Sequence, residues 1–291
     1  MSKMQYAIIT NPASGRMTVD RKRSFLTQAA EILDAEIHGL DTVSAKDFAQ
    51  RAQALANQCD VLVVAGGDGT LSDVINSIDT ASTPIAYLPS GTGNAMRYAL
   101  EYRGGLADIA MRIRDGKIRE YDLVSCDERR RAFMASVGIE GSVLRLREQY
   151  VSQGGIGFKT YFKAVLNAYF KEYQRASASI TVDGKTCDVK NLLSLMVVKQ
   201  PFYGFGMKVV PKARFRDGRL HILSINSGLF KSAVGGITAF TIGNQIGRYR
   251  TGQRLSVSLD RPLILQIDGN DGWEADRFQF SVIPNGLKIK C

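Results

Sequence analysis

Histidine is scarce in this chain of 291 residues, and His38 and His221 are the only two. Two histidines are few for the metal ligands of a zinc hydrolase or the base of a serine–histidine hydrolase, so both classes of enzyme are disfavoured. Four cysteines are present, and none forms a CxxC pair: Cys59, Cys126, Cys187 and Cys291. This spacing gives neither a metal signature nor a disulfide framework, so we expect four reduced thiols.

Long apolar runs are also missing. No run approaches the ~18–20 residues that span a bilayer, and the N-terminus, MSKMQYAIITNP, does not resemble a signal peptide. We therefore expect a cytoplasmic protein that contacts the inner face of the membrane only peripherally.

Two common nucleotide motifs are absent as well. The chain has no GxxxxGK[ST] sequence, and no GxGxxG follows any of its predicted strands. These absences disfavour P-loop NTPases and Rossmann dehydrogenases.

The composition favours a two-domain globular protein with an anionic partner. A chain of this length exceeds what one hydrophobic core usually organises. The 38 Lys and Arg residues against 28 Asp and Glu residues give a net charge of +10, which favours anionic lipids, phosphorylated small molecules or nucleic acid. Because no nucleic-acid-binding motif accompanies the charge, we expect no nucleic-acid partner.

The most informative stretch is Val61–Asn76, VLVVAGGDGTLSDVIN. Its apolar beginning predicts a strand buried on both faces of a parallel sheet, and its end has helical periodicity. The glycine-rich segment between them, Gly66–Thr70, suits a phosphate because glycines let backbone N–H groups approach an anion. Asp68 is the anomaly, since a carboxylate repels phosphate unless it serves a metal ion or a proton transfer. The alternative is that Asp68 caps a helix.

Similar loops follow other predicted strands. Asn11–Gly15 follows the strand Met4–Thr10, Thr42 follows Glu36–Leu40, and Ser90–Asn94 follows Pro84–Pro89. The carboxyl ends of parallel strands are where open α/β sheets bind ligands. Helices are expected between these strands, with an apolar stripe that includes Phe25 and with Ser44 opening the second helix.

From about residue 120 the pattern changes to short alternating runs separated by turns, which predicts an antiparallel sandwich or barrel. Asp183-Gly184 is a predicted hairpin turn. One long helix, Gly157–Tyr173, carries a broad apolar stripe flanked by lysines. Such a stripe favours a face that covers the core, and docking on anionic lipid is the alternative.

Five blocks of this sequence resemble the diacylglycerol kinase catalytic-domain family in order and spacing. They are Asn11–Gly15, Gly66–Thr70 followed by Asn76, Ser90–Asn94, Pro211–Leu220 and Ile267–Gly269. The resemblance spans almost the whole chain and is nearest to soluble bacterial lipid kinases, which are related to sphingosine and ceramide kinases. The GGDGT block alone is shared with NAD kinases.

The resemblance implies an N-terminal α/β nucleotide-binding domain with a Rossmann-like, NAD kinase-like fold, and a C-terminal antiparallel β-sandwich that receives the lipid. It places the first domain at residues 1–120, joined by residues 278–291, and the second at residues 121–277. It leaves the oligomeric state open, a homodimer included. The expected cofactors are ATP and Mg²⁺. The implied ATP contacts are Asn11, Ser14, Gly15, Thr42, Gly66, Gly67, Asp68, Gly69, Thr70, Leu71, Ser72 and Thr92. The implied metal ligands are the carboxylate of Asp217 and the backbone carbonyls of Arg214 and Arg219.

One departure from the family concerns the general base. The family's DG element usually continues with Glu, whereas this chain has Asn270. An amide can orient a hydroxyl but cannot accept its proton. Asp271 is the neighbouring carboxylate, although adjacent residues of an extended chain face opposite ways. The expected catalytic residues are therefore Asp68, Asp271 and Asn270.

The leading hypothesis is an ATP-dependent lipid kinase that phosphorylates a hydroxyl of a membrane lipid, most of all diacylglycerol or a similar acylated alcohol, in phospholipid metabolism. The alternatives are a kinase for sphingoid lipids or ceramide, a lipid- or nucleotide-binding protein that has lost transfer chemistry, and an NAD kinase-like enzyme.

Overall fold

The structure is a computed structural model that describes residues 4–15 and 17–291. The chain divides into two units, of which unit 1 comprises Met1–Tyr121 and Pro284–Cys291 and unit 2 comprises Asp122–Ile283. The C-terminal return to unit 1 begins at Pro284 and not at Phe278. The reason is that Phe278 and Phe280 are buried in the core of unit 2.

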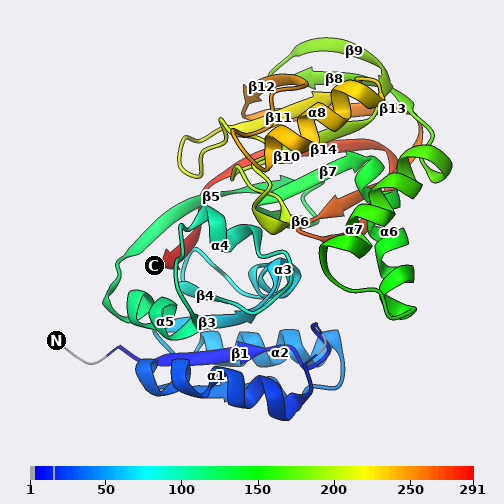
Figure 1. The fold of residues 1–291 in the computed structure, drawn as a ribbon. Coiled ribbons are helices and arrows are strands. Elements are labelled where there is room, and N and C mark those ends of the chain that lie inside the picture. Colours follow the sequence, from blue (N-terminus) through cyan, green and yellow to red (C-terminus); the bar gives the residue numbers. More distant parts are fainter. Residues whose placement is uncertain (1–3, 16) are drawn as a thin grey trace. The chain divides into compact units, whose positions relative to one another are not determined.

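Unit 1 alternates strands and helices (Figure 1). Its elements are β1 (Tyr6–Thr10), α1 (Val19–Leu33), β2 (Glu36–His38), α2 (Ala45–Ala56), β3 (Val61–Gly66), α3 (Asp68–Ser77), β4 (Ile85–Pro89), α4 (Ala95–Ala99) and α5 (Leu106–Asp115). It also holds the start of β5 (Ile118–Cys126) and the end of β14 (Asn270–Lys290).

These strands form the predicted parallel sheet. Strand β1 pairs with β2 on one side and with β3 on the other, β3 pairs with β4, and β4 pairs with β14 through Ile85 and Ile289. Every residue of β3 is buried, as its continuous apolar sequence predicted. Helix α1 packs against α5, and α2 packs against α3.

The first two helices differ from the prediction in one respect. Ser44 caps α2 as expected, with its hydroxyl accepting the N–H of Asp47 at 3.1 Å. The buried stripe of α1, however, does not include Phe25, which is 47% exposed. The residues that α1 buries are Lys22, Leu26, Ala29 and Leu33.

Unit 2 contains most of the antiparallel strands. Its elements are the remainder of β5, then β6 (Arg130–Ala132), β7 (Met134–Gly138), α6 (Ile139–Ser152), α7 (Gly157–Asn167), the π-helical turn η1 (Ala168–Glu172), β8 (Ala176–Val182), β9 (Lys185–Leu192), β10 (Ser194–Val198), the 3₁₀ turn η2 (Gly204–Gly206), β11 (Leu220–Ile225), α8 (Leu229–Ala239), β12 (Arg248–Gly252), β13 (Arg254–Ile267) and most of β14.

The long strand β13 allows the sheet of unit 2 to fold over one core. Its first half pairs with β8, its second half pairs with β7, and β14 runs along its other edge. Strands β7, β10, β11 and β12 continue the antiparallel order. The predicted hairpin turn Asp183-Gly184 joins β8 to β9, and both residues have the positive φ angles that such a turn needs.

The helices of unit 2 were predicted only in part. Helices α6 and α8 were not expected, and the long helix predicted for Gly157–Tyr173 is α7 followed by η1. One side of α7 packs on α6 through Ala164 and Tyr161, whereas its other side is exposed. The interpretation that the whole stripe covers the core is therefore wrong for Phe162, Leu166 and Phe170, which are exposed. Within residues 4–15 and 17–291, no helix combines the length and apolar character needed to cross a membrane.

Candidate functional site

The carboxyl ends of the strands in unit 1 meet at one edge of the parallel sheet. From β1 the chain moves outward to β2 and then returns across β1 to form β3. The direction of winding therefore reverses between β1 and β3, and at such a reversal the two flanking loops diverge and leave room for a ligand. The loops beside this point are Asn11–Gly15 after β1 and the Gly66–Thr70 segment after β3.

The segments after β3 and β4 are packed backbone to backbone. The N–H of Ser90 donates to the carbonyl of Gly66 at 2.9 Å. A Cβ atom added to Gly91 would lie 2.4 Å from the Cα of Gly67, which no side chain tolerates. Gly91 is thus needed for the close approach of the two backbones, whatever ligand the loops hold.

This arrangement gives the carboxylate of Asp68 a structural role. Its Oδ2 accepts the N–H of Ala95 at 2.8 Å, and its Oδ1 accepts the N–H of Met96 at 3.1 Å. The carboxylate therefore caps the first turn of α4, where the helix dipole favours a negative charge. Burial raises the pKa of Asp68, against the lowering effect of these N–H groups. The cap alternative considered from the sequence is the one observed, on α4 and not on Asp68's own helix α3.

The turn between β3 and α3 is also shorter than the glycine-rich segment of the sequence predicted. Gly66 is the last residue of β3, Gly67 is the N-cap of α3, and Asp68 is already the first helical residue. The N-terminus of α3 therefore lies directly at the carboxyl end of β3. A helix begun there directs its first N–H groups toward any anion bound at the edge of the sheet.

The first loop is held by a residue that sequence reasoning missed. The buried Lys22 of α1 donates from Nζ to the carbonyls of Asn11 at 2.6 Å and Pro12 at 2.7 Å. It also approaches the hydroxyl of Ser14 at 3.4 Å. Burial lowers the pKa of Lys22. The sequence held one sign that Lys22 is buried: it stands four residues before Leu26, on the buried stripe of α1. Its neighbours Arg21 and Arg23 made the segment look like an exposed basic run.

The other predicted ATP contacts differ in their exposure and in whether they keep a hydrogen-bond donor for a phosphate. Thr42 is buried, and its hydroxyl donates to the carbonyl of Gly39 at 2.7 Å. Leu71 has a fully buried side chain, and its N–H donates to the carbonyl of Gly67, so Leu71 lacks a free donor for a phosphate. Ser72 is fully buried as well, whereas Thr92 is exposed.

In unit 2 the predicted metal ligands lie around two other side chains. Lys199 Nζ donates to Asp217 Oδ1 at 2.8 Å and to the carbonyl of Arg219 at 2.5 Å. His221 Nε2 lies 3.1 Å from Asp217 Oδ2 and accepts the N–H of Arg214 at 3.0 Å. Burial alone would raise the pKa of Asp217, but the Lys199 hydrogen bond and the nearby charges lower it. Burial lowers the pKa of His221.

The DG element is a two-residue hairpin turn between β13 and β14. Asp268 and Gly269 have φ angles of 49° and 89°, the left-handed pair that a type I′ turn requires. The buried carboxylate of Asp268 anchors the turn by accepting the N–H of Met134 at 2.8 Å. Local geometry therefore accounts for the Asp-Gly sequence.

The two residues after this turn face opposite sides of the sheet. Asn270 stands opposite Ile267 and Asp271 stands opposite Gln266 in regular register. Residues directly opposite each other share a face, and successive residues along a strand point to opposite faces. Asp271 is exposed. The turn is not rearranged, so Asp271 does not lie on the same side of the sheet as Asn270.

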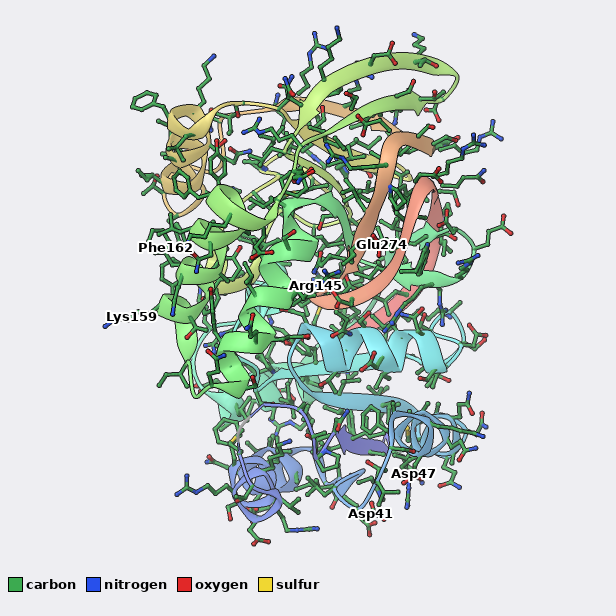
Figure 2. The ribbon with its side chains drawn as sticks, turned by 90° about the vertical axis from the view of Figure 1, so that its right-hand side faces the viewer. Asp41, Asp47, Arg145, Lys159, Phe162 and Glu274 are labelled. Carbon is green, nitrogen blue, oxygen red and sulfur yellow. The ribbon has the colours of Figure 1, made fainter. Side chains whose placement is uncertain are left out.

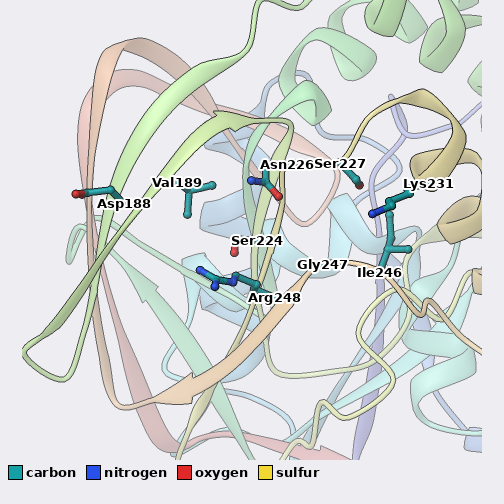
Figure 3. Close-up of a pocket in the computed structure, with 9 residues that line it drawn as sticks. All are labelled: Asp188, Val189, Ser224, Asn226, Ser227, Lys231, Ile246, Gly247 and Arg248. Carbon is teal, nitrogen blue, oxygen red and sulfur yellow. The ribbon is translucent and has the colours of Figure 1, made fainter.

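A hollow of about 510 Å³ in unit 2 has a different lining (Figure 3). It lies between β9, the end of β11, the start of α8 and the start of β12. Its lining residues are Asp188, Val189, Ser224, Asn226, Ser227, Lys231, Ile246, Gly247 and Arg248. None of them was a predicted site residue, so the hollow does not locate the expected chemistry.

The fold defines a two-domain protein of the NAD kinase-like class, with a parallel α/β unit and an antiparallel β-sandwich unit. Residues 5–126 match the diacylglycerol kinase catalytic domain, and residues 134–291 match the YegS C-terminal NAD kinase beta sandwich-like domain. The chain belongs to the diacylglycerol kinase catalytic domain family with a YegS-like C-terminal domain, a family of ATP-using lipid kinases.

Known relatives agree with this assignment over most of the chain. It is 25% identical over 275 residues to a Staphylococcus carnosus diacylglycerol kinase, with 91% of this chain and 88% of the relative covered. The Bacillus subtilis diacylglycerol kinase is 23% identical, with 91% and 89% covered. An uncharacterized Synechocystis protein is 22% identical, and the match covers 90% of this chain but 64% of that protein.

Solved structures support the fold alone. A Bacillus anthracis diacylglycerol kinase superposes with a TM-score of 0.73 at 16% identity, covering 100% of this chain and 98% of the other. An Archaeoglobus fulgidus NAD kinase in complex with ATP gives a TM-score of 0.53 at 12% identity, covering 98% and 93%.

Proposed function

We propose that this protein is an ATP-dependent lipid kinase that transfers the γ-phosphate to a hydroxyl of a membrane lipid, with diacylglycerol or a similar acylated alcohol as the acceptor. The observation that carries the proposal is the edge of the parallel sheet in unit 1, where Asn11–Gly15 and the start of α3 flank the reversal in strand order. The membership in a lipid-kinase family supplies the type of reaction.

In this proposal the N-terminus of α3 and the Asn11–Gly15 loop bind the ATP phosphates. Backbone N–H groups and a helix dipole suit that charge, and phosphoryl transfer depends mainly on positioning and charge neutralisation. A Mg²⁺ ion that arrives with ATP would neutralise part of the phosphate charge. Lys22 and Asp68 act as positioning residues, because they fix the Asn11 loop and the α4 start respectively.

We assign the acceptor's proton either to Asp271 or to a water molecule held by Asn270, because these two side chains face opposite sides of the sheet and do not act on the same hydroxyl. Asp271 is the carboxylate nearest in sequence to the position where the family carries Glu, and it is solvent-exposed. A missing general base costs about 10²–10⁴ in rate without abolishing transfer. The second candidate, a binding protein without transfer chemistry, is favoured by the same Asn270.

The test is transfer of labelled phosphate from ATP to diacylglycerol, sphingoid lipids, ceramide and NAD, with the lipids presented in mixed micelles. We expect transfer to diacylglycerol and its loss in Asp68→Ala, while Asp20→Ala, an exposed control, keeps full activity. Loss of activity in Asp271→Ala supports a relocated base. No activity in the wild type together with a large gain in Asn270→Glu supports the binding protein.

We also propose that the kinase meets an anionic membrane through the outer side of α7, η1 and α8, here called the docking surface. Its exposed apolar residues are Phe158, Phe162, Leu166, Phe170, Leu229, Phe230, Val234, Ile237 and Phe240. The ring of Phe158 contacts that of Phe240 with centroids 5.5 Å apart, so α7 and α8 present one continuous patch. Figure 2 shows Phe162 and Lys159 projecting outward from α7.

The charges of the docking surface fit an anionic bilayer. Helix α7 carries Lys159 and Lys163, η1 carries Lys171, and α8 carries Lys231. Neither α7 nor α8 contains Asp or Glu, and Glu172 of η1 is the single acidic residue of the three segments. Phenylalanines at this exposure among lysines are typical of helices that lie in the headgroup region.

A further inference from the structure

A buried charged group with several bonding partners in unit 2 is the side chain of Lys199, which follows β10. It is fully buried. Its Nζ lies 2.8 Å from Asp217 Oδ1, 3.0 Å from Asp122 Oδ2 and 2.5 Å from the carbonyl oxygen of Arg219. An ammonium group has three protons to donate, and here each has one oxygen acceptor.

These acceptors include the groups that the family resemblance assigns to a divalent metal. Asp217 and the Arg219 carbonyl both accept from Lys199, and the remaining predicted ligand, the carbonyl of Arg214, lies 3.2 Å from His221 Nε2. A magnesium or calcium ion sits about 2.0–2.6 Å from its oxygen ligands. An ion bound to Asp217 and the Arg219 carbonyl would therefore need the space that the Lys199 ammonium fills.

Electrostatics give the same answer. A divalent ion beside a buried ammonium would repel it at short range in a medium of low dielectric constant. Because the Lys199 ammonium already occupies the oxygens of Asp217 and Arg219, the residues present do not fit a resident divalent cation at this place.

The lysine can do the structural work that a metal would do there. It joins Asp122 of β5 to Asp217 and Arg219 of the loop that leads into β11. The second link of the loop is independent of Lys199, since Gly218 donates its N–H to Asp122 Oδ2 at 2.8 Å. Lys199 thus holds together two carboxylates that would otherwise repel each other. Because this cation is part of the chain, neither dilution nor a chelator can remove it.

We propose that Lys199 is a resident cation that replaces the structural divalent metal of this site. The Pro211–Leu220 loop is then ordered without free metal, and the divalent ion needed for catalysis is the one that accompanies ATP. The inference rests on contacts within unit 2 and not on the proposed kinase activity, so either can fail without the other.

The test compares thermal unfolding of the full chain in EDTA, in Mg²⁺ and in Ca²⁺, without nucleotide. We expect the wild type to have the same Tm in all three. Lys199→Gly removes the cation and opens its space, so its Tm in EDTA should fall by roughly 6–20 °C, and Mg²⁺ or Ca²⁺ should restore most of the loss. Lys199→Met keeps the volume without the charge, so its Tm should fall and stay low in metal.

A second measurement needs no Lys199 variant and remains decisive if Lys199→Gly does not fold. Mn²⁺ binding to the nucleotide-free wild type and to Asp217→Asn is followed by electron paramagnetic resonance. Equal binding by the two proteins supports the proposal. A Mn²⁺ site in the wild type that Asp217→Asn abolishes overturns it, and so does a folded Lys199→Gly variant that metal fails to stabilise.

Discussion

The carboxylate of Asp68 accepts the backbone N–H of Ala95 at 2.8 Å, which ties the first residue of α3 to the first residue of α4. Beside this bond, Gly91 approaches Gly67 so closely that a Cβ atom on Gly91 would lie 2.4 Å from the Cα of Gly67. The two loops after β3 and β4 are therefore one rigid unit, and the position of the α3 N-terminus depends on it.

Gly91→Ala tests this unit directly. The added Cβ would meet the Cα of Gly67 at 2.4 Å, so the loops must separate. We expect a loss of roughly 1–3 kcal/mol in the free energy of unfolding, measured by urea denaturation, and weaker ATP binding. The control is Gly236→Ala, because nothing lies within 4 Å of a Cβ in the middle of α8, and we expect a gain of up to about 1 kcal/mol. Equal effects of the two substitutions would contradict the clamp.

Lys22→Met tests the support of the first loop. The variant keeps the buried volume but leaves the carbonyls of Asn11 and Pro12 without their donor. We expect the free energy of unfolding to fall by roughly 1–3 kcal/mol and the Kd for ATP to rise by about 10-fold, because a loosened loop must be ordered on binding. Lys46→Met, at an exposed position of α2, should change neither quantity. An unaltered Kd in Lys22→Met would separate the loop from nucleotide binding.

Glu140 predicts a pH dependence of stability. Burial raises the pKa of Glu140 from 4.5 to about 7, against the hydrogen bond that Ser194 donates to it at 2.5 Å. Since the folded protein holds this proton more tightly than the unfolded chain, the stability it contributes is complete below pH 4.5 and is lost as the pH rises through about 7. Glu140→Gln should therefore be more stable than the wild type above pH 7, by roughly 1–3 kcal/mol, with no such advantage below pH 4.5.

Denaturation in urea at several pH values measures this difference. Glu148→Gln on the exposed side of α6 is the matched control, and it should follow the wild-type pH profile. If Glu140→Gln also follows that profile, Glu140 does not titrate in the inferred range.

Phe230→Ser tests the docking surface by cosedimentation with vesicles of phosphatidylglycerol and of phosphatidylcholine. Phe230 is 83% exposed on α8, so its removal should leave the fold intact while reducing binding to anionic vesicles by about 10-fold or more. Phe25→Ser, which removes a phenylalanine 47% exposed on α1, should bind as the wild type does. A preference for neutral vesicles, or equal losses in the two variants, would argue against this surface.

Much of unit 1 could be predicted from the sequence because its information is local. Continuous apolar runs gave the strands, and Ser44 gave the start of α2. In unit 2 the alternating runs and the turn Asp183-Gly184 gave the antiparallel sandwich. Helix α8 was missed because many of its apolar residues are exposed, as Phe230 illustrates. Helix α6 was missed although Ile139, Val143, Leu146 and Tyr150 form a packed stripe at helical spacing.

The sequence alone also determined the family, through five blocks whose order and spacing carry it. What each block does was decided by residues far away in the chain. Asp68 became a helix cap because Ala95 and Met96 present their N–H groups to it, and Lys22 became a loop anchor because α1 buries it beside Asn11. Asp217 accepts a hydrogen bond from Lys199 where the family pattern implied a metal ion, because Lys199 directly follows β10 and lies against Asp217. A carboxylate takes its role from the donors around it, and tertiary structure is what selects those donors.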